Sequence, residues 1–110
     1  MGMLVSVGKG FKVGGFDFAV DTSPQAHRMV TANNNFGECD LRNHTISLSS
    51  DIDETLLSKT FIHEVIEAVN NIYCDNGIPH DKIQQLSFGL HQALESLDVR
   101  FGVKNEEVQA

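Results

Sequence analysis

Three side chains able to bind or use a metal ion lie close together in residues 60–70 of this 110-residue sequence. His63 and Glu67 are four residues apart, and on a helix such residues lie on one face, about 6 Å from each other. The pair could therefore hold one divalent cation. Glu64 stands next to His63, where a general base for a metal-activated water would be needed.

The order His63-Glu64-x-x-Glu67 differs from the zinc-helix motif His-Glu-x-x-His only at its last position. The alternative is that these polar side chains only form the solvent-exposed face of a helix. Two features favour a metal site. The flanking residues are mostly apolar, which indicates a buried helix where unpaired charges are costly. In addition, no Lys or Arg lies between Lys59 and Lys82 to form a salt bridge.

Length and composition predict one globular domain, which we expect over residues 1–99, with a charged tail at 100–110. The net charge of −7 argues against nucleic-acid and anionic-membrane partners, because both require a basic surface. The first ten residues lack the charged region and long apolar core of a signal peptide, and no apolar run approaches roughly 20 residues, so we expect neither a signal peptide nor a membrane span. Since Cys39 and Cys74 are the only cysteines, we expect a reducing, cytoplasmic compartment.

The N-terminal half carries strand patterns. Residues 4–13 and 16–21 are joined by Gly14-Gly15, which predicts a hairpin. A turn near residues 42–43 would pair residues 38–41 with 45–48 in an antiparallel manner. A short helix could follow Pro24. We therefore expect an α+β fold in which a small antiparallel sheet of three to four strands precedes two helices.

The first of these two helices should run from about residue 54 to residue 73, with Asp51 or Asp53 as its N-cap and Gly77 as its left-handed stop. The second should begin near His80 and end near Leu97. Its apolar residues recur at steps of three and four, which predicts a stripe packed on the first helix. The stripe consists of Ile83, Leu86, Leu90, Ala93, Leu94 and Leu97.

A catalytic zinc site usually has three protein ligands and one open position. Candidates for the third ligand are His80, which the turn could fold back, and His91, which a straight antiparallel helix pair would bring level with residue 65. Glu95 is a further candidate. Cys74 lies about 16 Å along the axis from His63, too far for one metal.

Residues 37–97 resemble the minimal zincin-like metallopeptidases, small proteins often encoded by bacteriophages and prophages. The closest segments are HEVIEAVN at 63–70, IPH at 78–80 and LHQAL at 90–94. The usual form of this family has His-Glu-x-x-His and an acid near the start of the next helix. Here Glu67 and His80 stand in exchanged positions, so the resemblance implies a ligand set of His63, Glu67 and His80, with His91 as the alternative third ligand.

The resemblance further implies a zinc-dependent hydrolase with one Zn²⁺ per chain. Its substrate would be a peptide or protein, with Glu64 as general base. A strand at 44–49, if it lay at a sheet edge, could bind an extended peptide. Two alternatives remain. One is a metal-binding domain without catalysis, closed by a fourth protein ligand such as His91. The other is a metal-free acidic module that binds a protein partner.

Overall fold

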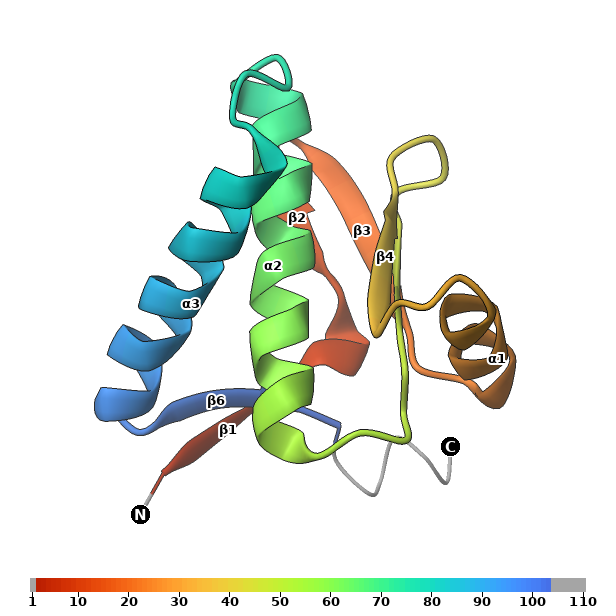
Figure 1. Cartoon of the computed structure of the whole chain (residues 1–110), viewed down its shortest axis with the longest axis vertical. Helices are drawn as coiled ribbons and strands as arrows, with labels where there is room; N and C mark the ends of the chain where they lie inside the picture. The colour runs from red at the N-terminus through yellow and green to blue at the C-terminus, as the bar shows by residue number, and fades with distance from the viewer. Residues whose placement is uncertain (1, 104–110) are drawn as a thin grey trace.

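The computed structural model describes residues 2–103 and places one long helix, α2, at the centre of the molecule (Figure 1). Helix α3 lies along one side of it and the main sheet along the other. The α+β fold expected from the sequence is confirmed. The strands are β1 (Met3–Ser6), β2 (Phe11–Val13), β3 (Phe16–Asp21), β4 (Gly37–Asp40), β5 (Thr45–Leu48) and β6 (Val99–Gly102), and the helices are α1 (Pro24–Ala32), α2 (Glu54–Tyr73) and α3 (His80–Ser96).

The main sheet has four strands in the order β2-β3-β5-β4. Both predicted hairpins are present: β2 pairs with β3 around Gly14-Gly15, and β4 pairs with β5. The sheet is mixed, however, and not wholly antiparallel, because β3 and β5 run parallel. Helix α1 carries the chain from β3 to the far edge, where β4 lies, and the hairpin then returns β5 between them. Strand β5 is therefore interior, so the expectation of an edge strand at 44–49 is wrong, and β4 forms the edge.

Two predicted boundaries differ from the structure. The strand expected at 4–13 is split into β1 and β2 by a 3-10 turn at Val7–Lys9. The fold also continues past the expected boundary at residue 99, because β6 pairs in parallel with β1. The Phe101 ring lies 5.0 Å from that of Phe61, centre to centre, which ties β6 to α2. The rest of the expected tail, residues 104–110, lies outside the described residues.

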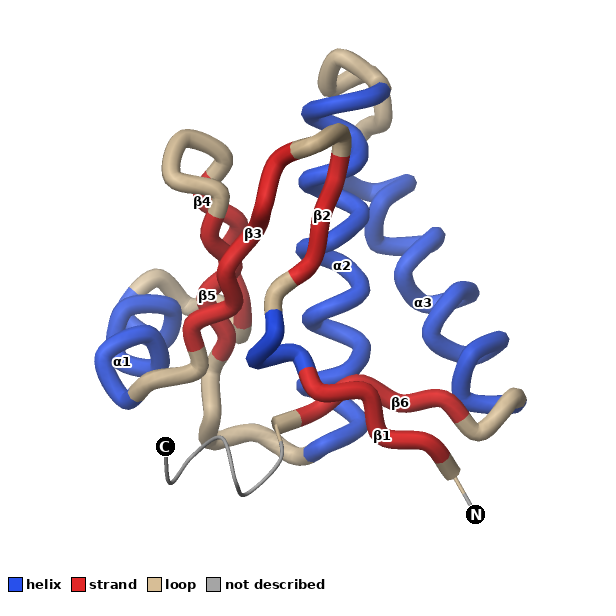
Figure 2. Tube along the Cα trace, turned by 180° about the vertical axis from the view of Figure 1, so that it is seen from behind, coloured by secondary structure: helices blue, strands red, loops and turns tan. Residues whose placement is uncertain are grey.

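The apolar core lies between α2 and the sheet, two elements that Figure 2 shows from behind. Leu57 and Phe61 of α2 pack with Ile46 and Leu48 of β5, and further along the helix Ala68 packs with Phe18 of β3. All are buried. The apolar face of α2 therefore fixes the helix against the sheet, and His63, Glu64 and Glu67 lie between these contacts along the helix.

Helix α2 begins where we predicted, with the Asp53 carboxylate accepting a hydrogen bond from the Leu56 N–H at 2.8 Å. Its end differs in detail. Asp75 and Asn76 take the left-handed conformation, with φ of 54° and 58°, and not Gly77. None of the helices in the described part of the chain is both long and apolar enough to cross a membrane.

The predicted stripe of α3 packs on α2 only in part. Ile83 is buried, and Ser87, which we did not assign to the stripe, is buried as well. Leu86, Leu90 and Leu97 remain exposed. Helix α3 is therefore rotated about its axis relative to the prediction.

Candidate metal centre

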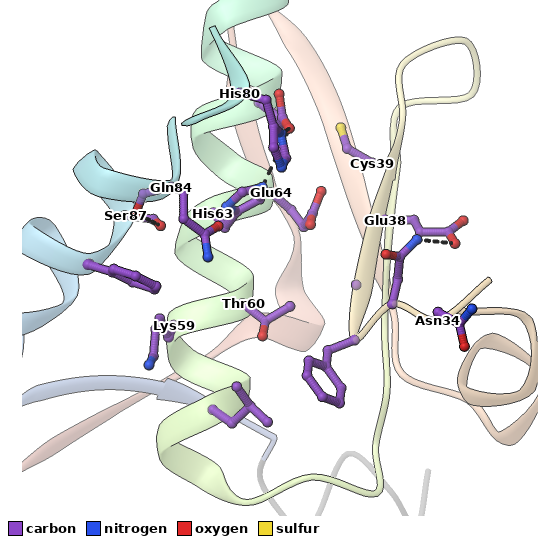
Figure 3. Close-up of a pocket in the computed structure, with 16 residues that line it drawn as sticks. Asn34, Glu38, Cys39, Lys59, Thr60, His63, Glu64, His80, Gln84 and Ser87 are labelled. Atoms are coloured by element: carbon purple, nitrogen blue, oxygen red, sulfur yellow. Dashed lines mark hydrogen bonds and ion pairs between the residues drawn. The ribbon is translucent and has the colours of Figure 1, made fainter. Parts of the chain in front are cut away.

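The structure brings His63, Glu67 and His80 together at one point between α2 and the start of α3 (Figure 3). One ligand atom from each lies within 4.8 Å of the others. Glu67 Oε2 is 3.5 Å from His63 Nε2 and 3.2 Å from His80 Nδ1. The two imidazole rings are 5.2 Å apart, centre to centre. His63 and Glu67 share one face of α2 because they are four residues apart.

The turn between α2 and α3 delivers His80 to this point. The buried Asn70 side chain holds the turn through both polar groups of its amide. Its Oδ1 accepts from the Ile78 N–H at 2.9 Å, and its Nδ2 donates to the Ile78 carbonyl at 3.0 Å. Ile78 is two residues before His80, so this clamp fixes where α3 begins. Asn70 was not recognised as a site residue from the sequence, and only its polar character within an apolar helix could have marked it.

Two of the three distances among the ligand atoms are close to those around a zinc ion, and the third is within 4.8 Å. Tetrahedral ligands at about 2.0–2.1 Å from a zinc ion are about 3.3 Å from one another. The two distances at Glu67 Oε2, 3.2 and 3.5 Å, lie on either side of this value. Two imidazoles and one carboxylate are also a donor set that zinc accepts. The residues present therefore fit a zinc ion.

Hydrogen bonds among the three side chains are the alternative to a metal. For Glu67 to form ion pairs with both histidines, both imidazoles would have to be protonated. Burial lowers the pKa of the His63 imidazole, although the neighbouring Glu67 and Gln84 act in the opposite direction. Neutral His63 is the form that binds a metal. Gln84 of α3 lies beside His63 in Figure 3 and was not predicted as a site residue.

Glu64 is buried beside the three candidate ligands and is only 7% exposed. Burial raises the pKa of its carboxyl group to about 8, and the charges of Glu67 and Glu38 add to the rise. A cation bound at the cluster would favour the charged carboxylate and lower this pKa again. The site therefore holds a carboxylate whose protonation is tied to the charge next to it.

A cleft of about 630 Å³ opens in front of these residues. One wall is α2 with His63, Glu64 and Glu67, and the opposite wall is the edge strand β4. Gly37 allows β4 to approach closely. A Cβ atom there would lie 2.6 Å from Thr60 Cγ2 and 3.4 Å from Glu64 Cγ. Strand β4 thus contributes to the burial of Glu64.

The other candidate ligands do not join the cluster. His91 Nε2 lies 3.3 Å from the Glu95 carboxylate, on α3. Cys74 is exposed at the end of α2. Cys39 projects from β4 into the cleft (Figure 3), but burial and then the charges of Glu64, Glu67 and Asp40 raise the pKa of its thiol to about 12, so it stays protonated. Among residues 2–103, no fourth His, Cys, Asp or Glu completes the group.

Comparison of the chain with protein-family models, with curated proteins and with solved structures gave no match. The candidate centre is therefore interpreted on its own geometry.

Proposed function

We propose that this protein is a zinc-dependent hydrolase that cleaves peptide bonds. The observation that carries the proposal is the convergence of His63, Glu67 and His80 at the wall of an open cleft, with the Glu64 carboxylate beside them. A structural zinc site is usually closed by a fourth protein ligand. Here the described residues supply three, and all three line the open cleft, which favours the hydrolase over a metal-binding domain without catalysis.

His63, Glu67 and His80 would hold the ion. When bound, zinc lowers the pKa of a water molecule towards 7 and polarises the scissile carbonyl group. Glu64 would accept the proton of the attacking water and donate it to the leaving nitrogen. Glu64 can accept this proton only as the carboxylate, the form that a cation at the cluster would favour by lowering the raised pKa of the carboxyl group.

The edge strand β4 supports a peptide as substrate. It faces α2 across the cleft, and one side of its backbone has no neighbouring strand in the described sheet. An extended peptide could pair with this free edge, so that its carbonyl groups pass in front of His63 and Glu64. This arrangement replaces the 44–49 strand that we expected from the sequence to have this role.

Metal analysis of purified protein tests the proposal. We expect about one zinc per chain, lost in His63→Ala and kept in the matched control His91→Ala, because His91 lies outside the cluster. A wild-type chain that takes up no zinc when supplied with it would contradict every metal-based function.

Catalysis is tested separately with a library of fluorogenic peptides. Glu64→Gln should retain zinc and lose about 10²–10⁴-fold in turnover, because the general base is removed. Retained zinc without hydrolysis by the wild-type chain would instead support the non-catalytic alternative. Turnover that survives Glu64→Gln would show that Glu64 is not the base.

A further inference from the structure

Helix α3 carries an uncovered apolar seam, formed by Leu86, Leu90, Ala93 and Leu97. Its three leucines are 51%, 46% and 71% exposed. Figures 1 and 2 show α3 at the margin of the molecule, with no other described element on its outer side. A row of large apolar side chains left in water marks an interaction surface more often than a free surface.

Three of the four seam residues lie in an uncharged part of the helix, and only Leu97 has charged neighbours in the sequence, Glu95 and Asp98. Between Ile83 and Leu94 the helix contains no Asp, Glu, Lys or Arg, although the whole chain has a net charge of −7. The centres of protein interfaces are depleted of charged residues in the same way. Two copies of an acidic chain repel each other, and this electrostatic repulsion is weakest where the uncharged segments face each other.

The spacing of the seam fits a second copy of the same helix. Its members follow one another at steps of four, three and four residues, which read the same in both directions. When two such helices run antiparallel about a two-fold axis, Leu86 faces Leu97 of the other copy, and Leu90 faces Ala93. Large side chains then meet large ones at the ends, and a large one meets a small one at the centre. A two-fold interface requires this self-complementarity.

Gly89, next to the seam, supports a close approach between helices. A glycine within a helix is destabilising, and a Cβ atom at this position would meet nothing within 4 Å in the described chain. No contact with residues 2–103 therefore requires glycine at this position. A second helix could approach closely at Gly89, which has no side chain, and at Ala93, which has only a methyl group.

We propose that α3 forms an antiparallel homodimer through the seam. Residues 104–110 are a poorer occupant, since they offer one large apolar side chain, Val108, against a seam of four positions. From Leu86 to Leu97 the seam is about 16 Å long. This is short for the roughly 800 Å² that each partner buries in a standard interface, so we expect a weak, reversible dimer.

Sedimentation equilibrium of the full chain over a range of concentrations tests the dimer. We expect a reversible monomer–dimer equilibrium whose dissociation constant rises at least tenfold in Leu90→Glu. The matched control is Met29→Glu, which adds the same charge at a 44% exposed residue on α1, and it should leave the constant within twofold. Circular dichroism confirms that each variant is folded. A wild-type chain that is monomeric up to about 1 mM would overturn the proposal and point to a different partner.

A charge exchange tests the antiparallel arrangement. Leu86→Asp and Leu97→Lys should each weaken the dimer, because each places a charge against an apolar partner. The double variant should recover affinity, since in an antiparallel pair the two new charges face each other with opposite sign, twice. In a parallel pair each charge would face its own copy, so a double variant no stronger than the single ones would overturn the arrangement.

Discussion

The burial of Glu64 predicts an unusual pH dependence of stability in the metal-free protein. The pKa of the carboxyl group is about 8 in the folded chain, against 4.5 for an ordinary glutamate. Between these values the folded state binds one proton more than the unfolded state at this residue. Stability therefore falls as pH rises through this window, and it is highest below pH 4.5 as far as Glu64 is concerned.

The size of the effect follows from the two pKa values. Each pH unit between them is worth about 1.4 kcal/mol, so the loss from pH 4.5 to pH 8 is roughly 5 kcal/mol. This is comparable with the whole stability of many small domains, about 5–15 kcal/mol. Zinc would oppose the loss, because it stabilises the charged form of Glu64.

The assay is urea unfolding of wild type and Glu64→Gln across this pH range, with a chelator present. Other titrating groups, His63 among them, contribute to both curves, so the quantity of interest is the difference between the two free energies of unfolding. We expect this difference to change by roughly 5 kcal/mol in favour of the variant as pH rises. Gln92→Ala, at an exposed residue of α3 that does not titrate, is the control and should give a flat difference. A change below about 1 kcal/mol for Glu64→Gln would refute the argument from burial.

Two further variants test the positioning of the site. Gly37→Ala should cost about 1–3 kcal/mol of stability in chemical denaturation, because its Cβ would meet Thr60 Cγ2 at 2.6 Å. Adding Thr60→Ser, which removes that methyl group, should restore part of the loss. If Gly37→Ala costs no stability, β4 can shift freely away from α2. Asn70→Ala should lower the free energy of unfolding by roughly 2–3 kcal/mol, because both hydrogen bonds to Ile78 are lost. It should also weaken zinc binding, measured by competition with a chelator, because His80 is no longer held in place. A zinc affinity unchanged from wild type would contradict the role of Asn70 as a clamp.

Local patterns predicted the elements of this fold well. The Gly14-Gly15 hairpin, the β4–β5 hairpin and the start of α2 follow from turn residues, alternation and the Asp53 cap, all of which are short-range signals. The parallel pairing of β3 with β5 did not follow, since it depends on how α1 crosses the sheet. The β1–β6 pair joins residues nearly one hundred positions apart, and no local pattern reports such a contact.

Local patterns likewise predicted only part of the arrangement of the candidate site. Helical spacing alone placed His63 and Glu67 on one face, and their proximity is a geometric consequence of α2. The approach of His80 depended on the resemblance to a family and not on spacing, because a turn of several residues can direct a side chain in many ways. The structure adds the reason for the approach, the clamp that Asn70 places on Ile78.

The error in the orientation of α3 and the approach of His80 have one physical origin. Successive residues on a helix are rotated by about 100°, so His80 and Ser87 lie within about 20° of each other, whereas Leu86 is about 120° from His80. A helix that turned Leu86 towards α2 would carry His80 away from Glu67. Because the structure buries Ser87 and brings His80 within 3.2 Å of Glu67, it must leave Leu86 and the rest of the seam exposed. Assembly of the candidate metal centre therefore leaves an apolar surface uncovered on the same helix, and a partner at that surface would stabilise the rotation that the centre requires.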